Sequence, residues 1–210
     1  MSNDEMQSFA FTPENLEKAK KIIAKYPAGK QQSAVMPLLD LAQRQVGWTS
    51  QAVMEYVAEM LDMAPIRVQE VVTFYTMYNQ KPVGKFHVQV CTNICCLLRG
   101  CDGVAETAKQ VLGVEWGETS ADGLFTLSEV ECLGACTNAP MMQVNDDYYE
   151  DLTPETTQAV LEALKRGETP KTGPQNGRQF SAPEGGPTTL TELTFVPAPL
   201  GASNSKGEKA

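Results

Sequence analysis

The sequence predicts an α+β chain in which an N-terminal four-helix bundle precedes an α/β domain with a mixed sheet. The first eighty residues carry helix caps and helical apolar spacing, whereas the residues after them alternate valine-rich strands with helices. All six cysteines fall in this second part. We therefore expect a helical bundle at residues 1–80, an α/β domain at 81–167, and a Gly/Pro-rich extended tail at 168–210.

Four amphipathic segments predict the helical part. Thr12 is an N-cap residue followed by Pro13 at the first helical position, and a second segment at 35–47 closes on a glycine. Ser50 caps a third segment, whose apolar residues fall at i, i+3, i+4, i+7 and i+8. A fourth follows with valines at 68, 71 and 72. Short helices joined by tight turns predict a small bundle.

The α/β domain is predicted in the order strand, helix, strand, strand, strand, helix. The first strand, "KFHVQVC", ends on Cys91, and the second, "GLFTLSEVEC", ends on Cys132. Between them lies the helix "GVAETAKQVLGV". The remaining segments are a hairpin that turns at "NDD" and a closing helix, "TPETTQAVLEALKRG".

Charge and composition exclude some functions. The net charge of -9 argues against nucleic acid as a partner, because phosphate binding depends on Lys and Arg. No run approaches the ~18 apolar residues that a membrane helix needs, and the start resembles neither a signal peptide nor a transit peptide. We therefore expect a soluble protein.

The last part of the chain has a different composition. From Gly167 onward, 13 of 44 residues are Gly or Pro. Such composition rarely supports a packed core. We expect either a disordered tail or an extended arm along a partner, in which "TTLTELTFVP" would be the segment that binds the partner.

The cysteines form two groups that we expect to converge. If the helix between the first two strands is a right-handed crossover, these strands run parallel and open on one edge of the sheet. The four-ligand choice with the best spacing is C-x4-C, then 35 residues, then C-x3-C, which selects Cys91, Cys96, Cys132 and Cys136. An all-thiolate set suits zinc or an iron-sulfur cluster.

The spacing leaves three interpretations open. The wide C-x4-C loop favours an iron-sulfur cluster over a structural zinc site, which commonly uses C-x2-C. A thiol oxidoreductase using Cys95 and Cys96 is the third interpretation, although the chain lacks the C-x-x-C of such enzymes. Outside the four ligands, we expect Cys95 to be a small buried hydrophobe and Cys101 a free thiol. The only histidine, His87, is expected to be a half-buried strand residue.

Gly134 and Ala135 lie between the last two predicted ligands. Small residues here would let backbone N–H groups approach the sulfurs, and such hydrogen bonds help to set the potential of a cluster. Ordinary turn formation would explain the same residues. Because the chain is acidic, we also expect a low reduction potential.

"CTNICC" and "VECLGACTNAPMMQVNDDYYEDLTPE" together resemble the 24 kDa iron-sulfur subunit family of respiratory NADH:quinone oxidoreductase, complex I. The likeness spans residues 10–195. It implies a helical bundle followed by a thioredoxin-like ferredoxin domain with one 2Fe-2S cluster. The ligand positions of the family match Cys91, Cys96, Cys132 and Cys136. Cys95 and Cys101 go beyond this four-ligand pattern.

The resemblance also implies the partners. A flavoprotein subunit would bind NADH and FMN, and the present chain would exchange one electron with that FMN, off the main path to quinone. The chain has no G-x-G-x-x-G phosphate loop, so we do not expect it to oxidise NADH alone. The implied location is the cytoplasmic face of the bacterial inner membrane, or the matrix side in a mitochondrion, with no direct insertion in the membrane.

Overall fold

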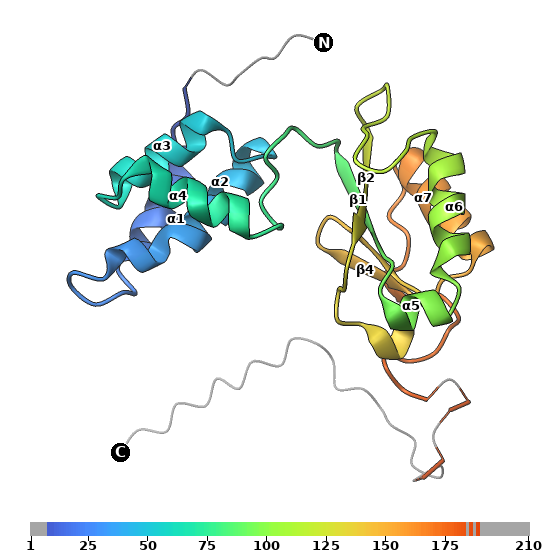
Figure 1. The fold of residues 1–210 in the computed structure, drawn as a ribbon. Coiled ribbons are helices and arrows are strands. Elements are labelled where there is room, and N and C mark those ends of the chain that lie inside the picture. The colour runs from blue at the N-terminus through green and yellow to red at the C-terminus, as the bar shows by residue number, and fades with distance from the viewer. Residues whose placement is uncertain (1–7, 184, 187, 190–210) are drawn as a thin grey trace.

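The protein is described by a computed structural model that covers residues 8–183, 185–186 and 188–189 (Figure 1). The chain is of the mixed α+β class, with helices first and a mixed sheet after them. The helices of the first part are α1 (Pro13–Ile23), α2 (Val35–Val46), α3 (Gln51–Met60) and α4 (Pro65–Phe74), with the 3-10 turn η1 (Gln31–Ala34) before α2.

Helix ends in the first part follow the local signals. The side chain of Thr12 accepts a hydrogen bond from the Asn15 N–H, and that of Ser50 accepts one from the Val53 N–H. Gly47 closes α2 in the left-handed conformation with φ 88°. These predicted caps are confirmed. One hydrophobic core joins the four helices, with Leu38 and Val57 fully buried in it. That the four helices form a regular bundle stays a prediction.

The second part is built on a five-stranded mixed sheet in the order β2-β1-β3-β4-β5. The strands are β1 (Phe86–Cys91), β2 (Phe125–Val130), β3 (Met142–Val144), β4 (Asp147–Glu150) and β5 (Gly173–Pro174). β1 and β2 are parallel, as predicted, with Cys91 opposite Val130. The predicted hairpin is confirmed as the antiparallel pair β3 and β4.

Two long helices, α6 (Cys101–Leu112) and α7 (Pro154–Lys165), pack on the same side of the sheet (Figure 1). Their apolar faces bury a core with the sheet, in which Val88, Leu127 and Leu161 are fully buried. Val88 and Leu127 face each other in the register of the parallel pair. Because β1 and β2 are parallel and end opposite each other, at Cys91 and Val130, both strands finish at the same end of the sheet.

Two short elements were not predicted, and both carry cysteines. α5 (Ile94–Leu98) contains Cys95 and Cys96, and the 3-10 turn η2 (Cys136–Asn138) begins at Cys136. They lie at the same end of the domain (Figure 1). The predicted second strand is too long, because β2 ends at Val130 and Cys132 lies in the loop beyond it.

Part of the expected tail packs on the α/β domain. β5 pairs in parallel with β4, and Arg178 forms a buried ion pair with Asp151. The segment therefore contributes to the domain, which composition alone did not predict. The segment "TTLTELTFVP" falls almost entirely outside the described residues. The domain boundaries at 80 and 167 stay predictions.

Candidate metal centre

The cysteines gather at the end of the sheet where the parallel strands β1 and β2 finish. Cys91 is the last residue of β1, and the loop after β2 carries Cys132 and Cys136. The two cysteine stretches, distant in sequence, therefore come to one edge, as predicted from the parallel pairing. All six thiols are free, so no disulfide competes for the sulfurs.

The first set of thiols is buried. Cys91, Cys96 and Cys101 are each at most 3% exposed and pack with Ala139 and Met141. Burial raises the pKa of the Cys96 thiol to about 12, and a hydrogen bond with Cys91 adds to this shift. Burial likewise raises the pKa of Cys101. Burial thus favours the protonated thiol at Cys96 and Cys101, and a metal that binds there would have to displace the proton.

The second set is more accessible. Cys132 and Cys136 are exposed and Cys95 is partly buried. A hydrogen bond with the Cys95 thiol raises the pKa of Cys136, and the nearby Cys132 acts in the same direction. Cys95 was expected to be a small buried hydrophobe, but it is only partly buried and lies beside Cys136, whereas Cys96 is buried. The reason is α5, whose helical turn separates the two neighbouring side chains by about 100°.

The predicted ligands thus meet as two neighbouring pairs, Cys91 with Cys96 and Cys132 with Cys136. Across the described residues, no three Cys, His, Asp or Glu side chains already form a closed metal-binding group. The ligand set Cys91, Cys96, Cys132 and Cys136 stays a prediction. The donor chemistry, six thiols and no imidazole within the cluster, fits an iron-sulfur centre.

The backbone of the second cysteine loop supplies a donor to sulfur. Gly134 has φ 82°, and its N–H donates a hydrogen bond of 3.4 Å to Cys132 Sγ. This approach of an N–H group to a sulfur was expected from the sequence. The positive φ explains why a residue without Cβ stands there. The consequence for a bound cluster would be a stabilised negative charge on that thiolate.

His87 is not part of this site. It lies in β1 and is partly buried, and its Nε2 is 2.8 Å from Ser128 Oγ on β2. Burial lowers the pKa of the imidazole. The predicted role, a half-buried strand residue, is confirmed.

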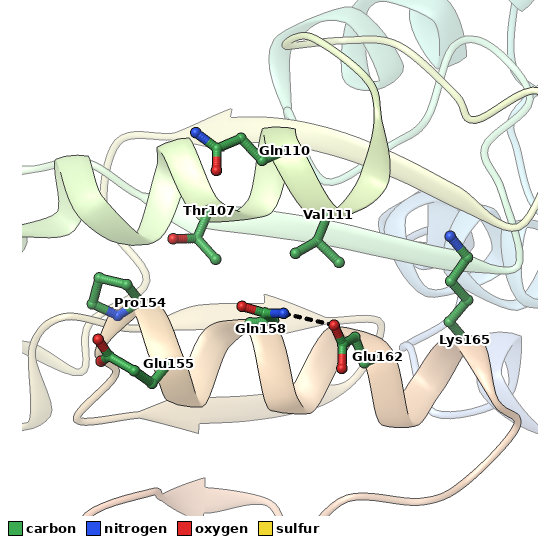
Figure 2. Close-up of a pocket in the computed structure, with 8 residues that line it drawn as sticks. All are labelled: Thr107, Gln110, Val111, Pro154, Glu155, Gln158, Glu162 and Lys165. Carbon is green, nitrogen blue, oxygen red and sulfur yellow. Dashed lines mark hydrogen bonds between the residues drawn. The ribbon is translucent and has the colours of Figure 1, made fainter.

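A separate shallow groove lies between α6 and α7 (Figure 2). Polar side chains line it, and Gln158 donates a hydrogen bond of 2.7 Å to Glu162 across one helical turn. No cysteine contributes to its lining: Thr107, Gln110, Val111, Pro154, Glu155, Gln158, Glu162 and Lys165. This groove is therefore separate from the cysteine-lined edge of the sheet.

A family model for thioredoxin-like [2Fe-2S] ferredoxins matches residues 19–165, which is most of the chain. The chain belongs to this family. A 2Fe-2S cluster is the cofactor by which the family is named, and the cysteine-lined edge is where these residues could hold it.

Two curated relatives of this ferredoxin are similar over most of its length. It is 51% identical over 196 residues to NADH dehydrogenase [ubiquinone] flavoprotein 2 of Dictyostelium discoideum, covering 93% of this chain and 79% of that protein. It is 53% identical over 164 residues to an NADH-quinone oxidoreductase subunit of Rickettsia bellii, covering 78% of this chain and 98% of that protein. The resemblance noted in the sequence is confirmed.

A solved structure supports the fold. The crystal structure of an NAD+-reducing [NiFe]-hydrogenase matches 63% of the ferredoxin and 22% of the hydrogenase chain, with a TM-score of 0.55 at 15% identity. At this identity the likeness concerns the fold alone. Within the described residues of the ferredoxin, no helix combines the length and apolar character needed to span a membrane.

Proposed function

We propose that the chain is the electron-transfer subunit of the NADH dehydrogenase module of complex I. In this role it carries one 2Fe-2S cluster on Cys91, Cys96, Cys132 and Cys136 and exchanges one electron with the FMN of a flavoprotein subunit. The observation that carries the proposal is the convergence of six free thiols on one sheet edge, in a chain 51–53% identical to named subunits of NADH dehydrogenases.

The chain's residues have distinct tasks in this proposal. A bound 2Fe-2S cluster supplies one-electron storage without proton transfer. Cys91 and Cys96 would hold it from the buried side, and Cys132 and Cys136 from the exposed loop. The Gly134 N–H, already on Cys132 Sγ, would stabilise the negative charge of that ligand. No residue is required as a general base, because storing this electron involves no proton transfer.

The exposed position of the second cysteine loop suits exchange with a partner. Electron transfer between subunits is faster when less protein separates the two centres, and Cys132 and Cys136 are both exposed. We place NADH and FMN on the flavoprotein partner, which is itself part of the larger enzyme. The remaining assignments belong to the same proposal: a four-helix bundle at 1–80, and a peripheral position on the cytoplasmic or matrix side of the membrane.

The test is iron and sulfide analysis of the full chain purified without oxygen, with its visible spectrum. We expect a brown protein with two irons and two sulfides per chain, and an EPR signal after dithionite. A colourless protein with one zinc would support the structural zinc site instead. Thiol-disulfide turnover without metal would support an oxidoreductase acting through Cys95 and Cys96.

Serine variants then test the ligand set. We expect the signal to disappear in Cys91→Ser, Cys96→Ser, Cys132→Ser and Cys136→Ser, and to persist in Cys95→Ser and Cys101→Ser. Cys95→Ser is the most informative of these variants, because the Cys95 thiol lies beside Cys136. Loss of the cluster in Cys95→Ser with its retention in Cys96→Ser would overturn the proposed set.

A further inference from the structure

Arg178 lies outside the family match yet is tied to the loop that carries Cys136. It is part of the segment that packs on the α/β domain after α7. Its Nε and Nη2 donate to the Asp151 carboxylate at 2.7 Å and 2.8 Å. Nη2 also donates to the Thr137 carbonyl at 2.6 Å, and Nη1 to the Ala182 carbonyl at 3.1 Å. The guanidinium is thus held at all three nitrogens.

This ion pair is buried, unlike the surface pairs of Arg44 and Arg166. The Arg178 and Asp151 side chains are 9% and 6% exposed, whereas in the pairs Arg44–Asp146 and Arg166–Glu168 both side chains are more than half exposed. Removing two charges from water is costly and is compensated only by full pairing. The bidentate contact and the two carbonyl contacts provide that pairing. Such an arrangement is rigid because each donor has a fixed acceptor.

The network closes on the residues that follow Cys136. Thr137, whose carbonyl Arg178 holds, is the next residue in the chain. Asn138 is 1% exposed, and its side-chain amide donates to Asp151 at 3.4 Å and to the Phe180 carbonyl at 2.9 Å. The Asp151 N–H in turn donates to the Asn138 carbonyl at 2.8 Å. The 3-10 turn η2 is therefore fixed at its second and third residues.

The first half of this loop is held by a neutral contact. The Tyr148 hydroxyl donates to the Leu133 carbonyl at 2.8 Å, next to the exposed Cys132. Gly134 has open space around the position of a Cβ. The charged and buried contacts of the loop thus lie on the Cys136 side, on the two residues after that cysteine. They come from Asp151, just beyond β4, and from Arg178 in the segment after α7.

We propose that Arg178 is a positioning residue for the Cys136 side of the metal centre. It acts on the site through Thr137, Asp151 and Asn138 and does not contact the sulfurs. The inference rests on the proposed function only in that Cys136 is taken as a ligand. It adds that a residue 42 positions further along the chain controls how firmly this ligand is held.

The experiment uses the full chain purified without oxygen, in wild-type, Arg178→Gln and Arg178→Lys forms. Two readouts are taken: the EPR spectrum after dithionite, and the rate of iron release to bathophenanthroline disulfonate. We expect Arg178→Gln to release iron about tenfold faster, which corresponds to ~1.4 kcal/mol and to the loss of a charge-assisted hydrogen bond. We also expect an altered EPR line shape. Arg178→Lys keeps the charge but not the planar bidentate donor geometry. Its rate of iron release should fall between those of the wild type and Arg178→Gln.

Arg166→Gln is the matched control, because Arg166 also forms a bidentate pair, with Glu168, but on the surface. It should retain the wild-type rate and spectrum. A folded Arg178→Gln with wild-type iron release and EPR spectrum would overturn the proposal. A merely structural role would lower the melting temperature and leave the EPR line shape of the remaining folded protein unchanged, which would also overturn it.

The single variant leaves the Asp151 charge buried and could fail to fold. The double variant Arg178→Gln with Asp151→Asn removes both charges and is then measured in its place, with the same expected and contrary results. Failure of the proposed function is distinguishable: wild-type protein would lack iron and sulfide. In that case the positioning of Cys136 is read from amide hydrogen exchange at residues 136–138. Exchange there should accelerate in the Arg178 variants and not in Arg166→Gln.

Discussion

Cys95 and Cys96 are adjacent in the chain but have different surroundings. Cys96 is buried with Cys91 and Cys101, whereas Cys95 points toward the exposed loop and lies beside Cys136. Spacing alone could not decide this, because the direction of each side chain depends on the five residues of α5. The residue types of the site could be read from the sequence, but their orientation depends on a helix too short to show a periodic pattern.

Gly134→Ala tests whether the backbone tunes the centre. An alanine at φ 82° is strained by about 1–2 kcal/mol, so the loop must shift and weaken the N–H donation to Cys132 Sγ. Losing a donor to a thiolate destabilises the reduced, more negative state, so the reduction potential should fall. An EPR-monitored redox titration measures it.

The control is Gly113→Ala, which has a similar positive φ of 67° at the end of α6, away from the cysteines. It should carry a similar backbone cost and leave the potential unchanged. An unchanged potential in Gly134→Ala, with the cluster intact, would count against tuning by this N–H group.

His87 gives a pH dependence that can be isolated, because it is the only histidine of the chain. Burial lowers its pKa in the folded protein, so the unfolded chain binds the proton more readily. The contribution of His87 to the free energy of unfolding is therefore fully present above its unfolded pKa of about 6.5. This contribution falls as the pH drops through that value toward the folded pKa. Urea unfolding at pH 7.5, 6.5 and 5.5 measures this slope.

His87→Gln keeps a polar group near Ser128 and removes the titration. The loss of stability between pH 7.5 and 5.5 should be smaller in this variant than in the wild type. Identical slopes for the two proteins would show that His87 does not contribute.

At the scale of elements, the long helices and their ends were predictable, whereas the short α5 and the packing of the segment after α7 were not. Caps such as Thr12 and Ser50 act within one turn, so the residues that matter are adjacent in sequence. The packing of residues 173–182 depends instead on the pairing of Arg178 with Asp151, 27 positions apart. Composition predicted an extended tail for this segment because the segment has few large apolar residues. Composition contains no information on whether two charged residues form a buried ion pair.

Thr153→Ala tests the cap of α7. The Thr153 hydroxyl accepts the Thr156 N–H at 3.2 Å, and the Thr156 hydroxyl accepts the Thr153 N–H at 2.8 Å. Losing this reciprocal pair should cost ~1 kcal/mol of unfolding free energy, measured by urea denaturation. The exposed Thr172→Ala is the control and should stay near zero. Equal losses in both variants would exclude a specific capping effect.

At the scale of the whole molecule, the helical part and the α/β domain each have their own hydrophobic core. One bidentate contact between them joins Arg44 on α2 to Asp146 in the β3–β4 turn, at 2.8 Å and 3.2 Å. Hydrogen bonds from Arg44 lower the pKa of the Asp146 carboxyl. Both side chains are more than half exposed, so solvent screens the pair.

A double-mutant cycle with Arg44→Gln and Asp146→Asn measures this link. We expect a coupling free energy below ~1 kcal/mol at low salt, decreasing further in 0.5 M sodium chloride. Asp40 also accepts from Arg44, so Asp40→Asn is included to separate the contact within α2 from the contact between the two parts. A larger coupling that is insensitive to salt would indicate a buried interface instead of a surface contact.

The late position of Arg178 in the chain bears on biosynthesis. Asp151 and Thr137 leave the ribosome before the side chain that neutralises one and binds the other, and domains fold in the order in which they are made. A nascent chain stalled before residue 178 would hold all six cysteines and an unneutralised carboxylate at the same edge. The edge that we propose to hold the cluster is therefore complete only after this segment has been translated.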